Sequence, residues 1–456
     1  MKRLQVKVPV FKRKQRGEIT VFLSLIFILI MSLVTALIES ASIRLVKNLR
    51  RVDLSMALES VFAEYDKELF DNYHVFAIDG GYGTGEFSYD MILDRLAFYG
   101  ADVTENQVSA SELLTDGAGL AFYQMAILYE KERTGLSLLP ETKLEFWQEN
   151  ENQNEQYQKE QDDVLSQITG KLDEAGEELP KEDNPIAFVG EWKKQGVLSL
   201  LLGGETELSN KVVDVQGLST HRDLRKGIGE ISGAQGSTGV VAKALFGNYI
   251  LKHFSNFANQ DEDRKLTYEI EYILGGQGSD KENLECVLNK LLMIRFPINY
   301  VYLLQDEAKK MEAEAMAAGL CSLLTVPGIT TLVKHAILLA WAYGESVVDI
   351  RTLAGGKKVP TVKTQETWNL QLSSLANLGN TSDSGKESET GMDYGEYLRI
   401  LLLLEKEETL CMRALDLIEN ELETPADAYV TGIGVKATCS IRKGVNCKFE
   451  ASHRYQ

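Results

Sequence analysis

The chain has 456 residues, of which 44% are hydrophobic, so it can build more than one core without disulfide or metal support. Its formal net charge is −19, and the first 16 residues hold seven Lys or Arg and no acid, which leaves 41 basic and 67 acidic residues in the remainder. An acidic body disfavours nucleic acid, because Lys and Arg that neutralise phosphates supply most of that affinity. We expect no nucleic-acid partner.

The first predicted element is a membrane anchor. Twenty uncharged residues, 19–38, follow a basic leader at 1–16, and twenty apolar residues in a helix cross a bilayer. This predicts a transmembrane helix at 17–40. The leader is more basic than the flank after the span, which favours a single-pass protein of the cell membrane with a cytoplasmic N-terminus and an extracytoplasmic body. A cleaved secretory signal is the alternative, although its apolar stretch would be unusually long and no convincing cleavage site follows.

The helix is expected to continue beyond the membrane, because residues 18–79 contain neither Gly nor Pro. Apolar residues recur at helical spacing through 41–73, which predicts that this half docks on a folded body. Residues 74–79 are typical of a short buried strand, and 117–133 of a helix. Together they make 41–145 the first part of the extracytoplasmic body.

Residues 146–240 are predicted to be an acidic and Gly-rich linker and insert. Residues 146–184 are dominated by Glu, Gln, Asn, Asp and Lys, a composition that favours a solvated helix or a linker over a compact core. An irregular segment follows at 185–240.

Residues 241–376 form a predicted helical middle region. It begins with a strand at 265–274, whose aromatic and β-branched residues favour that state. Pro297 and Pro327-Gly328 are expected to separate the helices that follow. These helices are predicted at about 281–294, 298–318 and 328–346.

A polar linker at 377–391 leads to the last region, 392–456, which begins with a helix at 393–422 and ends with an antiparallel β-hairpin. The residues of 428–441 and 445–451 alternate between apolar and polar. A three-residue loop at 442–444 pairs residues whose numbers sum to 886. Cys439 then faces Cys447, and the pair is either a disulfide candidate or two small apolar side chains that never oxidise.

Parts of the sequence resemble an uncharacterised family of pseudopilin-like proteins from low-GC Gram-positive bacteria, encoded with tight-adherence (Tad) pili and loosely related to their TadE and TadG members. The stretches that carry the resemblance are 16–25, 62–79, 268–284, 341–360 and the closing hairpin. It implies other pilin-like subunits or pilus assembly proteins as partners, and a prepilin peptidase that cuts between Gly17 and Glu18. The sequence departs from the pilin pattern at Phe22, where Glu is usual.

One side of the predicted span carries small or hydroxyl-bearing residues and one acid. They recur at three-, four- or eight-residue steps, namely Thr20, Ser24, Ser32, Thr35 and Glu39. Such residues let membrane helices approach and hydrogen-bond, so the stripe is a candidate for helix packing. Alternatively, Ser and Thr are tolerated in any span because they bond to their own backbone, and Glu39 reaches the headgroup water.

No pattern of catalytic chemistry is evident in the sequence. The five histidines show no metal-ligand spacing, and there is no P-loop or GxSxG motif. We expect no catalytic residue, no metal and no cofactor. The prediction is an α+β, helix-rich, non-enzymatic protein with one long N-terminal pilin-like helix, acting as a minor pseudopilin or assembly component of a Tad-type pilus. The alternatives are a membrane-tethered cell-envelope domain that binds a wall polymer or a protein, and an exported hydrolase.

Overall fold

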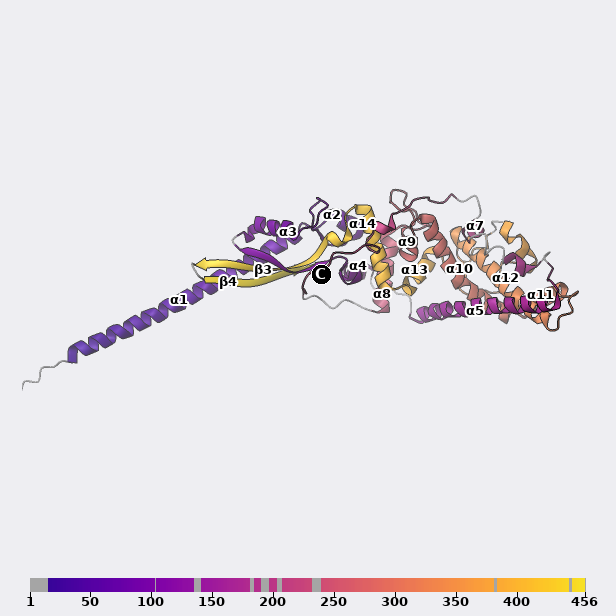
Figure 1. The fold of residues 1–456 in the computed structure, drawn as a ribbon, viewed down its shortest axis with the longest axis horizontal. Helices are drawn as coiled ribbons and strands as arrows, with labels where there is room; N and C mark the ends of the chain where they lie inside the picture. Colours follow the sequence, from indigo (N-terminus) through magenta and orange to yellow (C-terminus); the bar gives the residue numbers. More distant parts are fainter. Residues whose placement is uncertain are drawn as a thin grey trace, which may run out of the picture.

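The computed structural model shows an elongated molecule with a long helix projecting from one end (Figure 1). It describes residues 15–102, 104–134, 141–180, 184–189, 197–202, 207–231, 239–380, 384–442 and 445–455. The projecting helix is α1 (Gln15–Phe62); a small sheet lies beside its last turns, and a body of helices extends to the far end. The helix-rich α+β class, the long apolar N-terminal helix and the C-terminal antiparallel strands are confirmed.

Helix α1 is 48 residues long, which is roughly 72 Å at 1.5 Å per residue. It ends at Phe62 rather than continuing through residue 73, so the expectation of one unbroken helix is wrong. A new helix, α2 (Lys67–Tyr73), starts after Asp66, whose carboxylate accepts a hydrogen bond from the Leu69 N–H at 2.9 Å. The break therefore comes from a helix cap and not from Gly or Pro.

Strand β3 (Tyr429–Arg442) lies at the centre of a four-stranded antiparallel sheet. It pairs with β1 (Ile78–Asp79), β2 (Glu105–Leu113) and β4 (Val445–Arg454). The strand expected at 74–79 is thus limited to its last two residues.

The predicted hairpin register is confirmed from Gly432↔Arg454 to Ser440↔Asn446, including the pair Cys439↔Cys447. Beyond Ser440 the register shifts by one residue, and Arg442 pairs with Val445. The expected three-residue loop is therefore wrong at Arg442, which belongs to the strand. Residues 443 and 444 lie outside the described residues.

The last turns of α1 cover one face of this sheet. A small helix, α3 (Tyr89–Leu96), and the π-helical turn η1 (Ala97–Ala101) pack beside them. Leu54, Leu58 and Val61 of α1 share a fully buried apolar cluster with Ile433 and Val435 of β3.

The helical body forms a second and larger core. Its members are α4 (Asp116–Thr134), α5 (Glu141–Ala175), α7 (Val197–Leu202), α8 (Val240–His253), α9 (Glu269–Gly275), α10 (Asp280–Gln305), α11 (Glu307–Leu320), α12 (Ile329–Ala354), α13 (Tyr394–Leu404) and α14 (Glu407–Leu422). Short 3-10 turns occur at η2 (Val215–Gly217), η3 (Leu372–Asn380) and η4 (Ala426–Ala428).

The strand expected at 265–274 is wrong, because its second half forms α9. All seven residues of α9 are buried, including Glu269 and Glu271. Alternating residues favour a strand when one face of the segment is buried and the other is exposed, and here every side of the segment is buried. The two carboxylates accept hydrogen bonds from the N–H groups of Ser255 and Phe257 at 2.8 and 3.0 Å.

Three predicted helix boundaries also differ. The helix expected at 298–318 is divided at Asp306, which ends α10 and caps α11. Pro297 lies inside α10 instead of ending a helix, and Asn150 of α5 donates to the carbonyl of Ile294 in the turn before it at 2.7 Å. This bond ties the turn that the proline loosens to a neighbouring helix. The single helix expected at 393–422 is divided into α13 and α14 at Glu405 and Lys406.

The acidic stretch that starts at residue 146 lies mostly in α5, so the linker interpretation is wrong for that part. Helix α5 runs along α10 and α12 (Figure 1). It buries an apolar side that includes Trp147, Val164 and Ile168, while its remaining faces are largely exposed. The solvated-helix interpretation therefore holds for these outer faces only.

Candidate functional site on the N-terminal helix

No other described segment of the chain covers residues 19–42 of α1. Every residue from 19 to 42 is exposed, and the most apolar 18-residue window has a mean hydropathy of 2.9 with none of it buried. A soluble protein rarely exposes a continuous apolar surface of this size. The segment is long and apolar enough to be a membrane anchor or a signal sequence.

The residues predicted for processing and packing lie on this exposed half. Gly17 and Glu18 are in the first turns of α1, and the packing candidates are all exposed. The hydroxyl of Ser24 donates to the Val21 carbonyl, that of Ser32 to Leu29 and that of Thr35 to Met31, each at 2.8 Å. These three hydroxyls are thus satisfied within their own helix, as the alternative interpretation expects, and the stripe stays open for a partner.

The second half of α1 changes from exposed to buried within a few turns. Leu54, Ala57, Leu58 and Val61 are almost completely buried against the sheet. At the end of the helix, the Tyr455 hydroxyl donates to the Phe62 carbonyl, and the two rings lie 4.8 Å apart. The C-terminal residues of the chain therefore close over the end of α1.

An ion pair holds the turn after α1. Arg95 donates from Nε to Glu64 at 2.9 Å, and the Tyr99 hydroxyl donates to the same carboxylate at 2.6 Å. Partial burial alone would raise the pKa of Glu64, but the hydrogen bonds from Arg95 and Tyr99 outweigh it, so the pKa of this carboxyl is lowered. The exit of the chain from α1 is thus fixed by a charged contact as well as by packing.

Between the apolar segment and the docked turns, α1 carries a second exposed apolar stripe that the sequence analysis missed. It consists of Leu45, Leu49, Val52 and Met56, each more than half exposed. The 4-3-4 spacing places these residues on one side of the helix, roughly opposite the docked face at 3.6 residues per turn. Leu49 was expected to dock on the body, yet it is 55% exposed. The 4-3-4 spacing of these apolar residues is visible in the sequence. The prediction overlooked it because it assumed that all apolar residues of this half dock on the body.

The disulfide candidates lie on the sheet face that α1 covers. Cys439 and Cys447 are 4% and 9% exposed, and both are free thiols in this structure.

The helical body buries a cluster of charges far from α1. Arg295 contacts Asp349 at 2.9 Å, and Lys363 contacts Glu345 at 2.5 Å and Asp349 at 2.6 Å. Arg295 also donates to the carbonyls of Pro360 and Thr361 at 3.0 Å. These side chains are nearly inaccessible to solvent, so they fix the loop after α12 and offer no surface for substrate. No sequence motif marks them.

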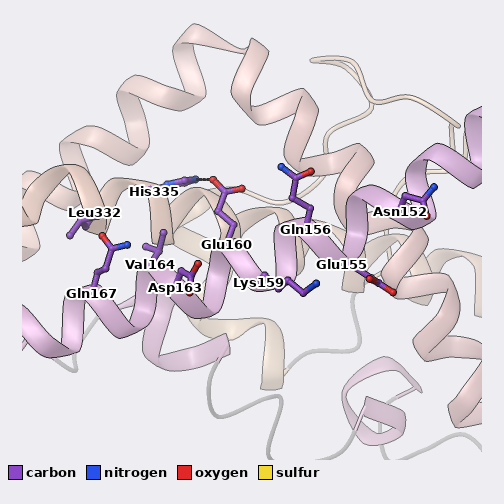
Figure 2. A pocket seen from close by; sticks show the side chains of 10 residues that line it. All are labelled: Asn152, Glu155, Gln156, Lys159, Glu160, Asp163, Val164, Gln167, Leu332 and His335. Carbon is purple, nitrogen blue, oxygen red and sulfur yellow. Dashed lines mark ion pairs between the residues drawn. The ribbon is translucent and has the colours of Figure 1, made fainter.

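The same body contains an open polar groove of about 700 Å³ between α5 and α12 (Figure 2). His335 of α12 reaches across to Glu160 of α5 at 3.2 Å, and the Tyr300 hydroxyl contacts the same histidine nitrogen. Most of the other lining residues, such as Gln156 and Lys159, come from α5. Within the described residues no group of three or more His, Cys, Asp or Glu has the arrangement of a metal site.

These features define a helix-rich α+β protein with one long apolar N-terminal helix whose last turns are docked on an antiparallel sheet. A model for a family of unknown function (DUF5702) matches residues 175–441, which is more than half of the chain. The chain belongs to this family. The matched range contains most of the helical body and nearly all of β3, and it lies outside α1. No curated protein and no solved structure matches the chain.

Proposed function

We propose that the protein is a membrane-anchored minor pseudopilin or assembly component of a Tad-type pilus, without enzymatic activity. The observation that carries the proposal is the division of α1, whose first half is apolar and exposed while its last turns are buried on a sheet. This division suits a subunit that is held in the membrane by one half of a helix and presents a folded body with the other. The sequence resemblance to pseudopilin-like proteins supports the same function.

The proposed topology puts residues 1–16 in the cytoplasm and the acidic body outside the cell. Other pilin-like subunits or assembly proteins are then the partners, and the exposed faces of α1 are the contact surface. Thr20, Ser24 and Ser32 would face a partner helix inside the bilayer. The stripe at Leu45, Leu49, Val52 and Met56 would extend the contact beyond it, because apolar residues with this spacing pack between helices.

Processing at Gly17 follows from the same proposal, with prepilin peptidase as the enzyme. Mass spectrometry of the mature N-terminus tests it. A protein that begins at Glu18 supports processing, whereas a terminus that retains residues 1–16 rules it out and leaves an uncleaved anchor.

The function is tested by pull-down of the full-length protein from detergent-solubilised membranes. Two variants should each lower recovery of pilin-like subunits at least several-fold. One carries Leu at Thr20, Ser24 and Ser32 together, and the other carries Leu49→Glu. Leu323→Glu is the matched control, since Leu323 is 89% exposed and follows α11 in the chain; helix α11 lies at the end of the molecule opposite α1 (Figure 1). Equal recovery from all variants would contradict assembly through α1.

One observation favours a second function, a membrane-tethered domain that binds a cell-envelope polymer or protein. The groove of Figure 2 is lined with amide and charged side chains suited to hydrogen bonding with a polar ligand. Under this alternative, Gln156→Ala and Glu160→Gln should weaken binding of the full-length protein to isolated cell wall. The same changes should leave the recovery of pilin-like subunits unaltered.

A further inference from the structure

The two cysteines of the hairpin occupy directly opposed backbone positions. The Tyr455 N–H donates to the Thr431 carbonyl at 3.0 Å, in the register that pairs Cys439 with Cys447. Hydrogen-bonded pairs alternate along an antiparallel ladder, and an even number of steps separates the two positions, so the cysteines are also a hydrogen-bonded pair. The Cα atoms of such a pair are about 5.5 Å apart, within the range of roughly 4.4 to 6.8 Å found in disulfides.

Both sulfurs project toward the same, covered face of the sheet, because directly opposed residues share a face. Cys439 lies in one apolar cluster with Ala437 and Phe449, and with Leu54 and Leu58 of α1. Docked α1 therefore shares an apolar cluster with Cys439, and Cys447 lies opposite it and is 9% exposed. The pairing of β3 with β4 ends only a few residues beyond, at Arg442↔Val445, so the cysteines lie near the turn that joins the two strands and far from the open end at Gly432↔Arg454.

The other three cysteines are in different surroundings. Cys286 is in α10, Cys321 follows α11 and Cys411 is in α14. Burial raises the pKa of the Cys321 thiol, and burial together with the nearby Glu407 and Glu408 raises that of Cys411. A raised pKa keeps a thiol protonated, and the thiolate is the form that attacks a disulfide. Cys321 and Cys411 are therefore internal controls.

We propose that Cys439 and Cys447 form an intramolecular disulfide that locks the turn end of the β3–β4 hairpin. The proposal rests on the extracytoplasmic placement of the body, where disulfides persist. The oxidant is an exported dithiol–disulfide oxidoreductase in its disulfide form. One cysteine thiolate attacks that disulfide and gives a mixed disulfide, and the second thiolate attacks the mixed disulfide. The protein keeps the new S–S bond, while the oxidant leaves as a dithiol with the two electrons and two protons.

The burial of both sulfurs sets the order of events. An oxidoreductase cannot reach them once α1 is docked, so the exchange precedes docking. Afterwards the same burial shields the bond from reductants. The bond closes a short ring beside the turn of the hairpin that lies along α1 (Figure 1) and keeps β3 and β4 paired at that end.

The test uses the full-length protein in native membranes, quenched with acid and alkylated under denaturing conditions before and after reduction. Trypsin cuts after Lys436, Arg442, Lys443 and Lys448. The disulfide should therefore join the peptides 437–442 and 444–448, and the linked mass should disappear on reduction. Cys286, Cys321 and Cys411 should be alkylated without reductant. Complete alkylation of Cys439 and Cys447 before reduction overturns the proposal.

A topology reporter separates this failure from that of the proposed function. Leu323→Cys introduces an exposed thiol in the body, which a membrane-impermeant maleimide should label in intact cells. A labelled reporter with free Cys439 and Cys447 overturns the disulfide alone. An unlabelled reporter overturns the extracytoplasmic placement and, with it, both proposals.

Hydrogen exchange measures the clamping role. Wild-type protein reduced during refolding keeps every side chain but lacks the bond. Its amides in 437–442 and 445–449, on either side of the bond, should exchange roughly tenfold faster than those of the oxidised protein. Cys286→Ser should leave these rates unchanged. Equal rates with and without the bond overturn the clamp.

Discussion

The core beneath the sheet and the core of the helical body are stabilised by different interactions. Beneath the sheet, aliphatic and aromatic side chains of α1 meet the alternating residues of β3 and β4. The helical body also buries full charges, among them Arg295, Asp349 and Lys363. The first kind of core depends on local periodicity, whereas the second depends on partners that are distant in the sequence. The comparison therefore shows which parts of the fold a sequence pattern can specify.

The largest expected effect comes from breaking the buried charge cluster. Asp349→Ala leaves Arg295 and Lys363 without this partner in the interior, which should lower the free energy of unfolding by about 4 kcal/mol. Denaturant unfolding of the detergent-solubilised protein measures it. Glu314→Ala, which breaks an exposed pair with Lys334 at 2.6 Å, should have a much smaller effect, because solvent screens this pair. Equal losses in the two variants would show that the cluster is not a distinguishing feature of the body.

Truncation of a docked residue of α1 tests the apolar core. Leu58→Ala should cost about 3 kcal/mol, because it leaves a cavity beneath the sheet. Leu49→Ala is the matched control on the same helix and should change stability by less than about 0.5 kcal/mol, since Leu49 is exposed. Unfolding of the sheet region, followed by hydrogen exchange in β3 and β4, gives both values. A large effect of Leu49→Ala would place a hidden contact on the exposed stripe.

The helical body should also respond to pH. Burial raises the pKa of Glu271 to about 7 from 4.5, although the Phe257 N–H and the Tyr394 hydroxyl donate to its carboxylate. The folded state then binds this proton more tightly than the unfolded state, so its contribution to stability falls as pH rises from about 5 to 7, by about 2 kcal/mol.

Glu271→Gln should flatten this part of the stability profile, measured by denaturant unfolding at a series of pH values. Glu269 has the same raised pKa, about 7, and therefore should retain its own share of the slope in that variant. An unchanged profile would mean that Glu271 titrates alike in the folded and unfolded states.

The smallest effect is expected where α1 ends. Asp66→Ala removes the N-cap of α2 and should cost about 1 kcal/mol, measured as a lower midpoint of thermal unfolding. Asp90→Ala is the control, since Asp90 lies in the first turn of α3 and is not its cap; Ser88 is. If the two variants behave alike, the turn after Phe62 is set by packing against the sheet rather than by the cap.

The sequence by itself determined the apolar half of α1, the fold class and the register of the hairpin. Both signals are local patterns. Twenty consecutive uncharged residues favour an apolar helix, and a strict two-residue alternation favours a strand with one buried face. The alternation alone places Cys439 opposite Cys447, without any tertiary contact. The exposed stripe of α1 was present in the same residues, but spacing does not tell which side of a helix a body will cover.

Only the tertiary structure decided the helical state of Glu269–Gly275, the continuation of α10 through Pro297 and the pairing of Arg295 with Asp349. Each depends on a neighbour outside the local pattern: Ser255 beside Glu269, Asn150 beside Ile294, and α12 beside α10. A local pattern fixes the preference of a segment, whereas burial and hydrogen bonding supplied by distant residues add enough free energy to override it.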